Sequence, residues 1–204
     1  PEDFAVLELS SFQLHSMTGR ANAAVVTNVS PNHLDVHPSY ADYIEAKKSI
    51  FRSQQAEDVL VLNLDNEITA SFAPEARGEV RLFSRKQPVE NGAYAENGTI
   101  YLVENGQSRA LMRTGEICIP GVHNVENYLA AFCAVRGLVD EDTMRRVARE
   151  FTGVEHRLEV VRTLRGVTYV NDSIASSPTR TIAGLRSYED RGIRPILIAG
   201  GYDK

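Results

Sequence analysis

The sequence lacks an excess of basic residues, a long apolar run and a recognisable cysteine pattern. Its 204 residues include 22 Lys and Arg against 27 Asp and Glu, which gives a formal net charge of −5. This balance disfavours nucleic acid as a partner. No apolar run approaches the roughly 18 residues that cross a membrane, so we predict no membrane span. Cys118 and Cys133 form neither a metal-ligand spacing nor a disulfide framework, which favours a reducing cytoplasm.

The sequence also lacks a phosphate loop. The motif G-x-x-x-x-G-K-[ST], whose backbone amides cradle nucleotide phosphates, does not occur. A nucleotide site that needs this loop would have to obtain it from sequence that the chain does not contain. The hydrophobic content of 43% and the charged content of 24% are ordinary for a globular protein, and the length allows one large domain or two smaller ones.

Both ends of the chain carry apolar runs. Residues 4–9 and 195–199 have the composition of buried parallel strands. Domains rarely begin or end on a central strand without covering helices. We therefore expect the chain to be an internal piece of a longer protein.

Strand and helix patterns alternate along most of the chain, which predicts an α/β fold with a mostly parallel sheet. The further strand signals lie at residues 23–29, 58–62, 80–83, 167–170 and 193–199. Apolar residues at helical spacing predict helices over 124–136 and 141–151. The pattern breaks at Gly153, where we place a domain boundary between residues 1–154 and 155–204.

One stretch departs from this alternation. Between residues 93 and 119 the apolar residues fall in short alternating runs, separated by turns at Asn97-Gly98 and Asn105-Gly106. Asn-Gly is the dipeptide that two-residue hairpin turns prefer. We predict a β-hairpin excursion at the edge of the sheet.

Polar side chains follow two of the predicted strands. Ligands of open α/β sheets bind beyond the carboxyl ends of strands, so Glu8 is placed to hold a metal ion. Its alternative role is a carboxylate that caps the following helix, and the local pattern supports both equally. His33 follows the strand signal at 23–29. A lone loop histidine is more often structural, but two strand ends with potential ligands favour a functional site modestly.

Lys47 is unusual within the helix that we predict to begin after Ser39. It lies four residues after Tyr43 and three before Ile50, on the apolar face, whereas Lys48 points elsewhere. Burial lowers the pKa of a lysine, and a neutral amine can react with carbon dioxide to form a carbamate that binds metals as a carboxylate does. The alternative is a lysine that extends its ammonium to the surface, which the local pattern favours.

Other candidate ligand groups have ordinary alternatives. Asn124 suits the N-cap of the helix over 124–136, and Asn127 lies one turn further on, where amides can read the edge of an adenine ring. Arg157 lies at the domain junction and can reach a phosphate, although a linker salt bridge explains it equally well. Asp172 and Lys204 each follow a predicted strand, and a turn acid and a solvated lysine are the favoured local explanations.

The order of these motifs resembles the Mur ligase family over essentially the whole chain. The matching segments are Glu8-Leu9-Ser10-Ser11-Phe12-Gln13-Leu14, Asn32-His33-Leu34-Asp35, Ala46-Lys47, Pro120-Gly121-Val122-His123-Asn124, His156-Arg157, Asn171-Asp172-Ser173 and Gly200-Gly201-Tyr202-Asp203-Lys204. The resemblance implies part of a central parallel-sheet ATPase domain over residues 1–154, without its phosphate loop. It implies the start of a Rossmann-like C-terminal domain over residues 155–204.

The resemblance also implies roles for individual residues. Glu8 would hold a magnesium ion that bridges the ATP phosphates. His33 and a carbamylated Lys47 would serve a second magnesium ion and the catalytic step. Given the resemblance, we favour a carbamate at Lys47 over an ammonium that extends to the surface.

The remaining roles concern nucleotide and substrate. The resemblance implies that Asn124 and Asn127 contact adenine and that Arg157 and Asp172 contact the nucleotide from the C-terminal side. It implies that substrate contacts come from Ser10, Ser176 and Lys204.

The implied activity is ATP-dependent amide ligation in peptidoglycan synthesis, with UDP-N-acetylmuramoyl-L-alanine and D-glutamate as substrates. An acyl phosphate would form first, and the amine of D-glutamate would attack it. The nearest alternatives are another Mur ligase or a folylpolyglutamate synthase. A non-catalytic α/β binding module is an alternative from another class, supported only by the missing phosphate loop. Because that loop is missing, we expect the chain alone to be inactive.

Overall fold

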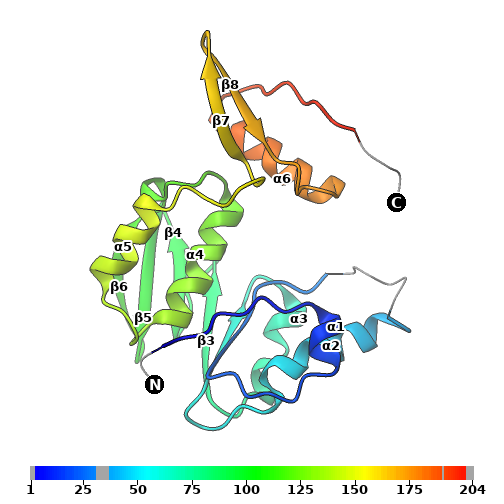
Figure 1. Cartoon of the computed structure of the whole chain (residues 1–204). Helices are drawn as coiled ribbons and strands as arrows, with labels where there is room; N and C mark the ends of the chain where they lie inside the picture. The colour runs from blue at the N-terminus through cyan, green and yellow to red at the C-terminus, as the bar shows by residue number, and fades with distance from the viewer. Residues whose placement is uncertain (1–2, 31–36, 190, 201–204) are drawn as a thin grey trace.

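A six-stranded mixed sheet forms the centre of the structure (Figure 1). The computed structural model describes residues 3–30, 37–189 and 191–200. The sheet strands are, in spatial order, β1 (Ala23–Val26), β2 (Val59–Asn63), β3 (Glu79–Ser84), β4 (Gly92–Glu96), β5 (Thr99–Glu104) and β6 (Gln107–Arg113). Neighbouring strands from β1 to β4 are parallel, and those from β4 to β6 are antiparallel. The predicted α/β class is confirmed.

Helices flank the sheet. The helices are α1 (Ser11–His15), α2 (Tyr40–Arg52), α3 (Glu67–Ala70), α4 (Val122–Val135), α5 (Glu141–Glu150) and α6 (Pro178–Glu189), with short 3₁₀ turns η1 (Ala73–Glu75) and η2 (Thr114–Glu116). Ser39 caps α2 as predicted, because its hydroxyl accepts a hydrogen bond from Asp42 N at 3.1 Å. No helix of the described residues is long and apolar enough to cross a membrane.

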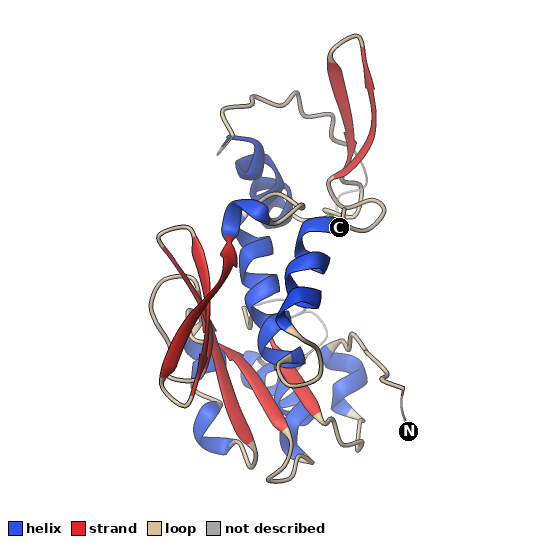
Figure 2. Cartoon of the chain, turned by 90° about the vertical axis from the view of Figure 1, so that its left-hand side faces the viewer, coloured by secondary structure: helices blue, strands red, loops and turns tan. Residues whose placement is uncertain are grey.

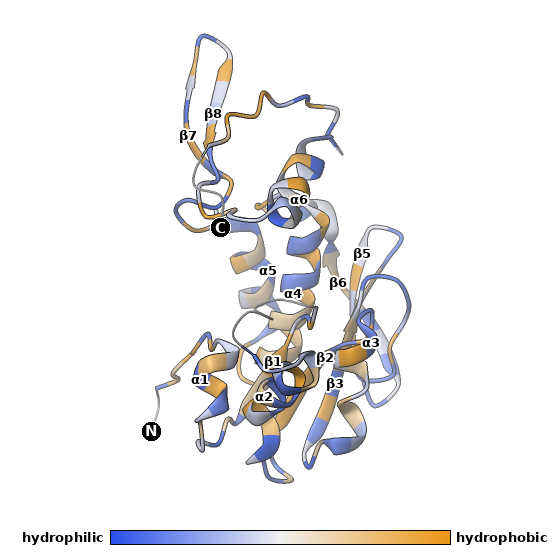
Figure 3. Cartoon of the chain, turned by 90° about the vertical axis from the view of Figure 1, so that its right-hand side faces the viewer, coloured by the Kyte–Doolittle hydropathy of each residue, from blue (hydrophilic) through white to orange (hydrophobic). Residues whose placement is uncertain are grey.

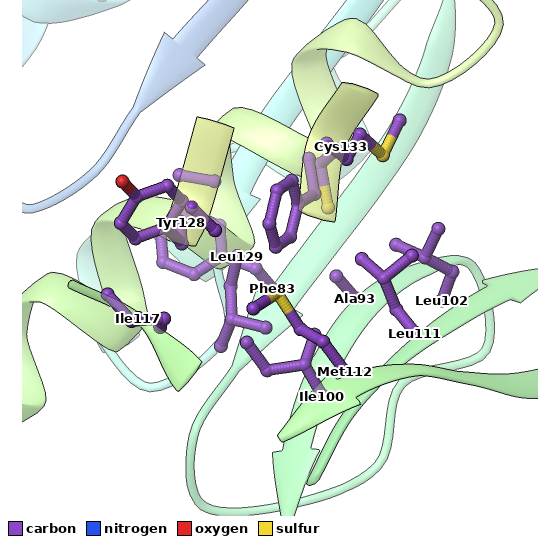
Figure 4. Close-up of a cluster of buried hydrophobic side chains, with 14 of the residues drawn as sticks. Phe83, Ala93, Ile100, Leu102, Leu111, Met112, Ile117, Tyr128, Leu129 and Cys133 are labelled. Atoms are coloured by element: carbon purple, nitrogen blue, oxygen red, sulfur yellow. The ribbon is translucent and has the colours of Figure 1, made fainter. Parts of the chain in front are cut away.

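Side chains of the central strand β2 alternate between two cores. Val61 packs into the cluster formed with α4 and α5, whereas Leu60 and Leu62 pack against Tyr43 and other side chains on the opposite face. Figure 2 shows α4 and α5 side by side against the sheet. The larger core cluster joins β3 to β6 with α4, and Figure 4 shows its side chains converging. Burial on both faces explains why β2 is apolar from Val59 to Leu62.

The edge excursion is confirmed as a β4–β5–β6 meander. Asn97-Gly98 joins β4 to β5, and Asn105-Gly106 joins β5 to β6. Both asparagines have φ near 50° and both glycines have φ near 72°. These left-handed values are those of the hairpin turns that Asn-Gly favours.

Three strand predictions need correction. Residues 4–9 and 193–199 form no strand, and their apolar side chains are exposed, as 95% for Val6 and 93% for Ile198 indicate. Figure 3 shows the apolar residues along the segment that follows α6. The strand at 167–170 exists as β8 (Val167–Asn171), but it pairs antiparallel with β7 (Glu159–Leu164) in a separate two-stranded sheet. An apolar run becomes a strand only where a neighbour completes its hydrogen bonds.

Two buried arginines fasten the carboxyl end of α4 to the sheet. Arg81 Nη1 donates to the carbonyls of Cys133 and Arg136, which lie at the end of the helix. Arg136 Nη2 donates to Glu79 Oε1 at 2.6 Å and to Asn91 Oδ1 at 2.8 Å. The network therefore satisfies carbonyls that a helix end leaves without partners.

We expect Arg136→Met to lower the free energy of unfolding by about 3 kcal/mol, because it removes three hydrogen bonds of a buried guanidinium, to Val103 O, Glu79 Oε1 and Asn91 Oδ1, each contributing roughly 1 kcal/mol. Urea unfolding followed by circular dichroism measures this change. Arg146→Met on α5 is the control, since the Arg146 side chain is 61% exposed and its ion pair is 3.9 Å long. The control should change stability by less than about 0.5 kcal/mol. Equal effects of the two substitutions would contradict the proposed role of the network.

The same network should make stability depend on acid pH. Hydrogen bonds from Arg81 and Asn91, with the charges of Arg81 and Arg136, lower the pKa of Glu79 from its usual 4.5 to about 2. A lowered folded-state pKa contributes stability that is fully present above pH 4.5 and lost as the pH falls towards 2. We expect Glu79→Gln to be destabilising at pH 7 and the difference from wild type to shrink below pH 4.5. Urea unfolding at a series of pH values checks this, and a difference that is constant with pH would refute it.

Candidate functional site

The first part of the candidate site lies where α1 meets α2. Ser10 caps α1 with a reciprocal pair of bonds: its hydroxyl accepts from Gln13 N at 3.4 Å, and Gln13 Oε1 accepts from Ser10 N at 2.8 Å. The cap is thus Ser10 rather than Glu8, so the capping alternative for Glu8 is wrong. Glu8 is exposed in the irregular segment before α1. Its carboxylate remains free of a capping role.

Lys47 and Lys48 lie in different surroundings, as predicted. Lys47 Nζ lies 5.8 Å from the centre of the Tyr43 ring, and burial lowers the pKa of its ammonium while the charge of Glu8 raises it. Lys48 Nζ instead donates to Glu75 Oε1 at 2.6 Å, and this bond raises the pKa of Lys48. At Lys47 burial is the largest influence and favours the neutral amine, against the charge of Glu8. At Lys48 the hydrogen bond to Glu75 outweighs burial and favours the ammonium.

The predicted metal ligands are described only in part. His33, and likewise Lys204, the expected substrate contact, lie outside the described residues. Among the residues that the structure describes, no three His, Cys, Asp or Glu side chains gather in a way that could hold a metal ion. The charge of Glu8 raises the pKa of Lys47, and the complete ligand set stays a prediction.

The second part is a cavity at the amino-terminal end of α4. It has a volume of about 410 Å³ and lies between α4, the end of α5 and the segment that leads to β7. Its apolar wall includes Ile119, Tyr128, Val147, Phe151 and Leu158, and its polar groups are His123, Asn124, Asn127 and Arg157. An apolar slot with a few convergent polar groups is the usual form of a small-molecule site.

The two asparagines of this cavity are linked to each other. Asn124 Nδ2 donates to Pro120 O at 2.6 Å, and Asn127 Nδ2 donates to Asn124 Oδ1 at 3.2 Å. Each amide has two donors and two lone pairs, so both keep hydrogen-bonding capacity for a ligand. The prediction of Asn124 as N-cap is wrong: Gly121, with φ of 105°, occupies that position, and Asn124 is buried in the first turn. Its side chain fixes the first turn to the preceding proline instead.

Arg157 and Asp172 come near the cavity from the carboxyl-terminal part of the chain. Arg157 lines it directly. Asp172 Oδ1 accepts a hydrogen bond from Leu158 N at 3.1 Å, which ties β8 to the segment that carries Arg157. Ser176 is exposed in the turn before α6 and does not line the cavity.

His123 is a cavity residue that the sequence reasoning did not select. Burial and the positive charge of Arg157 lower the pKa of its imidazole, although Glu126 and Asp172 oppose this. A neutral imidazole can accept a hydrogen bond at one nitrogen and donate at the other. The sequence feature that could have identified His123 is its spacing from Asn127, because residues four apart lie on the same face of a helix.

Comparison with known proteins identifies the class of protein. The Mur ligase middle domain matches residues 1–135, and the chain belongs to the Mur ligase family.

The relatives point to one member of that family. The chain is 59% identical to the UDP-N-acetylmuramoylalanine--D-glutamate ligase of Acetivibrio thermocellus over 99% of its residues, and 53% identical to the enzyme of the same name from Clostridium beijerinckii over 100%. It spans 43% of the length of each relative.

Solved structures of Mur ligases share the fold. MurF from Acinetobacter baumannii superposes with a TM-score of 0.66 at 17% identity, over 83% of this chain and 38% of that one. MurC from Thermotoga maritima superposes with a TM-score of 0.64 at 20% identity, over 87% and 40%. MurF from Thermotoga maritima, solved in complex with ADP, has a TM-score of 0.58 at 18% identity, over 83% and 39%.

We expect Lys47 to form a carbamate more readily than Lys48, because only the neutral amine attacks carbon dioxide and burial favours that form at Lys47. Carbon-13 NMR of the protein in ¹³C-labelled bicarbonate should show a carbamate resonance. Lys47→Arg should abolish this resonance and Lys48→Arg should leave it unchanged. A resonance that survives Lys47→Arg would assign the carbamate to another amine and refute the expectation.

Proposed function

We propose that the chain is the central part of an ATP-dependent ligase that joins D-glutamate to UDP-N-acetylmuramoyl-L-alanine in peptidoglycan synthesis. Two relatives that cover nearly all of the chain at 59% and 53% identity carry the name of that enzyme. The observation that carries the proposal is the presence, in one chain, of an apolar cavity with a few polar groups at the start of α4 and of the Glu8 and Lys47 side chains at α1 and α2.

The cavity is proposed to hold the adenine nucleotide. Its apolar wall suits a flat base, and the amides of Asn124 and Asn127 keep donors and acceptors that match the edge of adenine. Arg157 on the cavity wall suits a phosphate, which a guanidinium binds through two parallel hydrogen bonds. The ADP complex of Thermotoga maritima MurF, a protein of similar fold, is consistent with this assignment.

Magnesium is proposed as the metal of the Glu8 and Lys47 groups. Mg²⁺ prefers oxygen ligands, and a carboxylate together with a lysine carbamate supplies them, with His33 as a further proposed ligand. Bound Mg²⁺ would stabilise the negative charge gathered between the nucleotide phosphates and the acceptor carboxylate. The half-buried position of Lys47, which favours its neutral form, supports the carbamate.

The proposed reaction has two steps. The alanyl carboxylate of the UDP-sugar attacks the terminal phosphorus of ATP, and ADP leaves as the bond to its β-phosphate oxygen breaks. The amine of D-glutamate then attacks the resulting acyl phosphate, loses a proton and displaces inorganic phosphate, which gives the amide. In this scheme Asn124 and Asn127 orient the base, and Arg157 and Asp172 approach the nucleotide from the carboxyl-terminal side. Ser10, Ser176 and Lys204 would lie near the substrates. The cytoplasm is the proposed location.

The decisive measurement is phosphate release by the full-length protein with ATP and UDP-N-acetylmuramoyl-L-alanine. D-glutamate, L-lysine and diaminopimelate are added separately, and we expect release with D-glutamate only. Arg157→Ala should raise the KM for ATP about tenfold, because a charged hydrogen bond contributes roughly 1.5 kcal/mol. Arg146→Ala, on the exposed face of α5, is the matched control and should leave KM unchanged.

Each outcome discriminates between candidate activities. Release with another amino acid would assign a different Mur ligase, and no release with any of them would overturn the substrate assignment. The 204-residue chain alone, which lacks the phosphate loop, should release no phosphate.

A further inference from the structure

His37 connects the two helices on which the Glu8 and Lys47 groups depend. Its Nδ1 lies 2.8 Å from Asp42 Oδ2 in the first turn of α2, and its Nε2 lies 2.9 Å from Ser11 Oγ at the start of α1. An ionised carboxylate only accepts hydrogen bonds, so Nδ1–H donates to Asp42, and in the tautomer with its proton on Nδ1 the Nε2 atom accepts from the Ser11 hydroxyl. Both nitrogens of the imidazole are thereby used within the protein.

Aromatic rings hold the imidazole from two sides. The Phe12 ring of α1 stacks on it with centroids 5.2 Å apart and an interplanar angle of 17°. The Tyr43 ring of α2 meets it edge-on at 5.3 Å and 77°. His37 itself is only 6% exposed. One side chain thus contacts both helices through two hydrogen bonds and two ring contacts.

This arrangement has the parts of a hydrolytic triad but not its access. Ser11 is 3% exposed, so a substrate carbonyl cannot reach its hydroxyl as the nucleophile of a triad requires. The hydrogen bonds that join Ser11, His37 and Asp42 therefore fix the two helices relative to each other and do not activate a nucleophile.

The positions that it fixes are those of two proposed ligands. Glu8 precedes Ser11 by three residues and lies in an irregular, exposed segment that α1 anchors. Lys47 follows Tyr43 by about one turn of α2, with Nζ 5.8 Å from the centre of the Tyr43 ring. His37 contacts one residue near each proposed ligand in the sequence. It bonds to Ser11, which follows Glu8, and its ring meets that of Tyr43, which precedes Lys47.

We propose that His37 is a positioning residue: it fastens α1 to the start of α2 and thereby sets the position of Glu8 relative to Lys47. The effect on magnesium binding and catalysis rests on the proposed function. The fastening of α1 to α2 does not, because it concerns only the fold of the chain. Groups that orient metal ligands without touching the metal commonly change metal affinity when they are removed.

The test uses a zero-length carbodiimide cross-link in the full-length protein. The reagent activates a carboxylate as an O-acylisourea, which a neighbouring amine displaces to form an amide. Mass spectrometry compares the yield of the Glu8–Lys47 cross-link with that of Lys48–Glu75, whose charged atoms lie 2.6 Å apart. The second cross-link joins the neighbouring residue of α2 to η1 and does not involve α1, so it is an internal reference for reactivity and folding in every sample.

His37→Phe keeps an aromatic ring beside Phe12 and removes both hydrogen bonds. We expect it to reduce the Glu8–Lys47 yield several-fold relative to the reference. Ser11→Ala, which removes one bond, should have a smaller effect in the same direction. Asp42→Asn keeps an oxygen that can accept from Nδ1–H, so its Glu8–Lys47 yield should stay close to that of the wild type. His15→Phe is the matched control, because His15 is exposed at the end of α1.

A catalytic measurement separates positioning from general stability. In His37→Phe we expect the Mg²⁺ concentration for half-maximal phosphate release to rise about tenfold, with little change in kcat at saturating Mg²⁺. An unchanged cross-link yield in His37→Phe, or no Glu8–Lys47 cross-link in the wild type, would overturn the proposal. If His37→Phe loses the reference cross-link through misfolding, an unchanged yield in Ser11→Ala overturns it. Wild-type protein that releases no phosphate but shows the expected cross-link pattern would remove the proposed function and support the positioning role.

Discussion

Burial of both faces of β2 is the constraint on which the rest of the structure depends. A strand covered on both sides needs helices on both sides, and the chain supplies α2 with its neighbours on one face and α4 with α5 on the other. The two parts of the candidate site follow from this arrangement. Lys47 is carried by a helix of one layer, and Asn124 by a helix of the other. The sheet is therefore the common frame for groups that lie far apart in the sequence.

Much of this frame could be predicted from periodicity and turn chemistry. The apolar run that became β2, the cap at Ser39 and the Asn-Gly turns each depend on local rules that hold wherever the residues lie. The different surroundings of Lys47 and Lys48 were likewise predictable, because adjacent residues on a helix point in directions about 100° apart. The local sequence pattern was sufficient to predict an element where the segment that packs against it is part of the same structure.

The errors share a physical cause. Residues 4–9 have the composition of a strand, but pairing is a property of two segments, and a composition does not reveal whether a neighbour exists. Asn124 was expected as a cap because asparagine favours that position, yet Gly121 adopts the conformation there and the asparagine bonds back to Pro120. His37 could not be singled out, since its partners Ser11 and Asp42 lie on different helices and only tertiary structure brings them together.

The state of Lys47 illustrates why such tertiary contacts matter for chemistry. Burial of the lysine favours the neutral amine, and the nearby Glu8 carboxylate favours the ammonium. Burial is supplied by the face of α2, whereas Glu8 is placed by α1. The balance between amine and ammonium thus depends on how the two helices are fastened together. The proposed role of His37 follows from this dependence: a side chain that contacts both helices influences the reactivity of Lys47 by setting the position of Glu8.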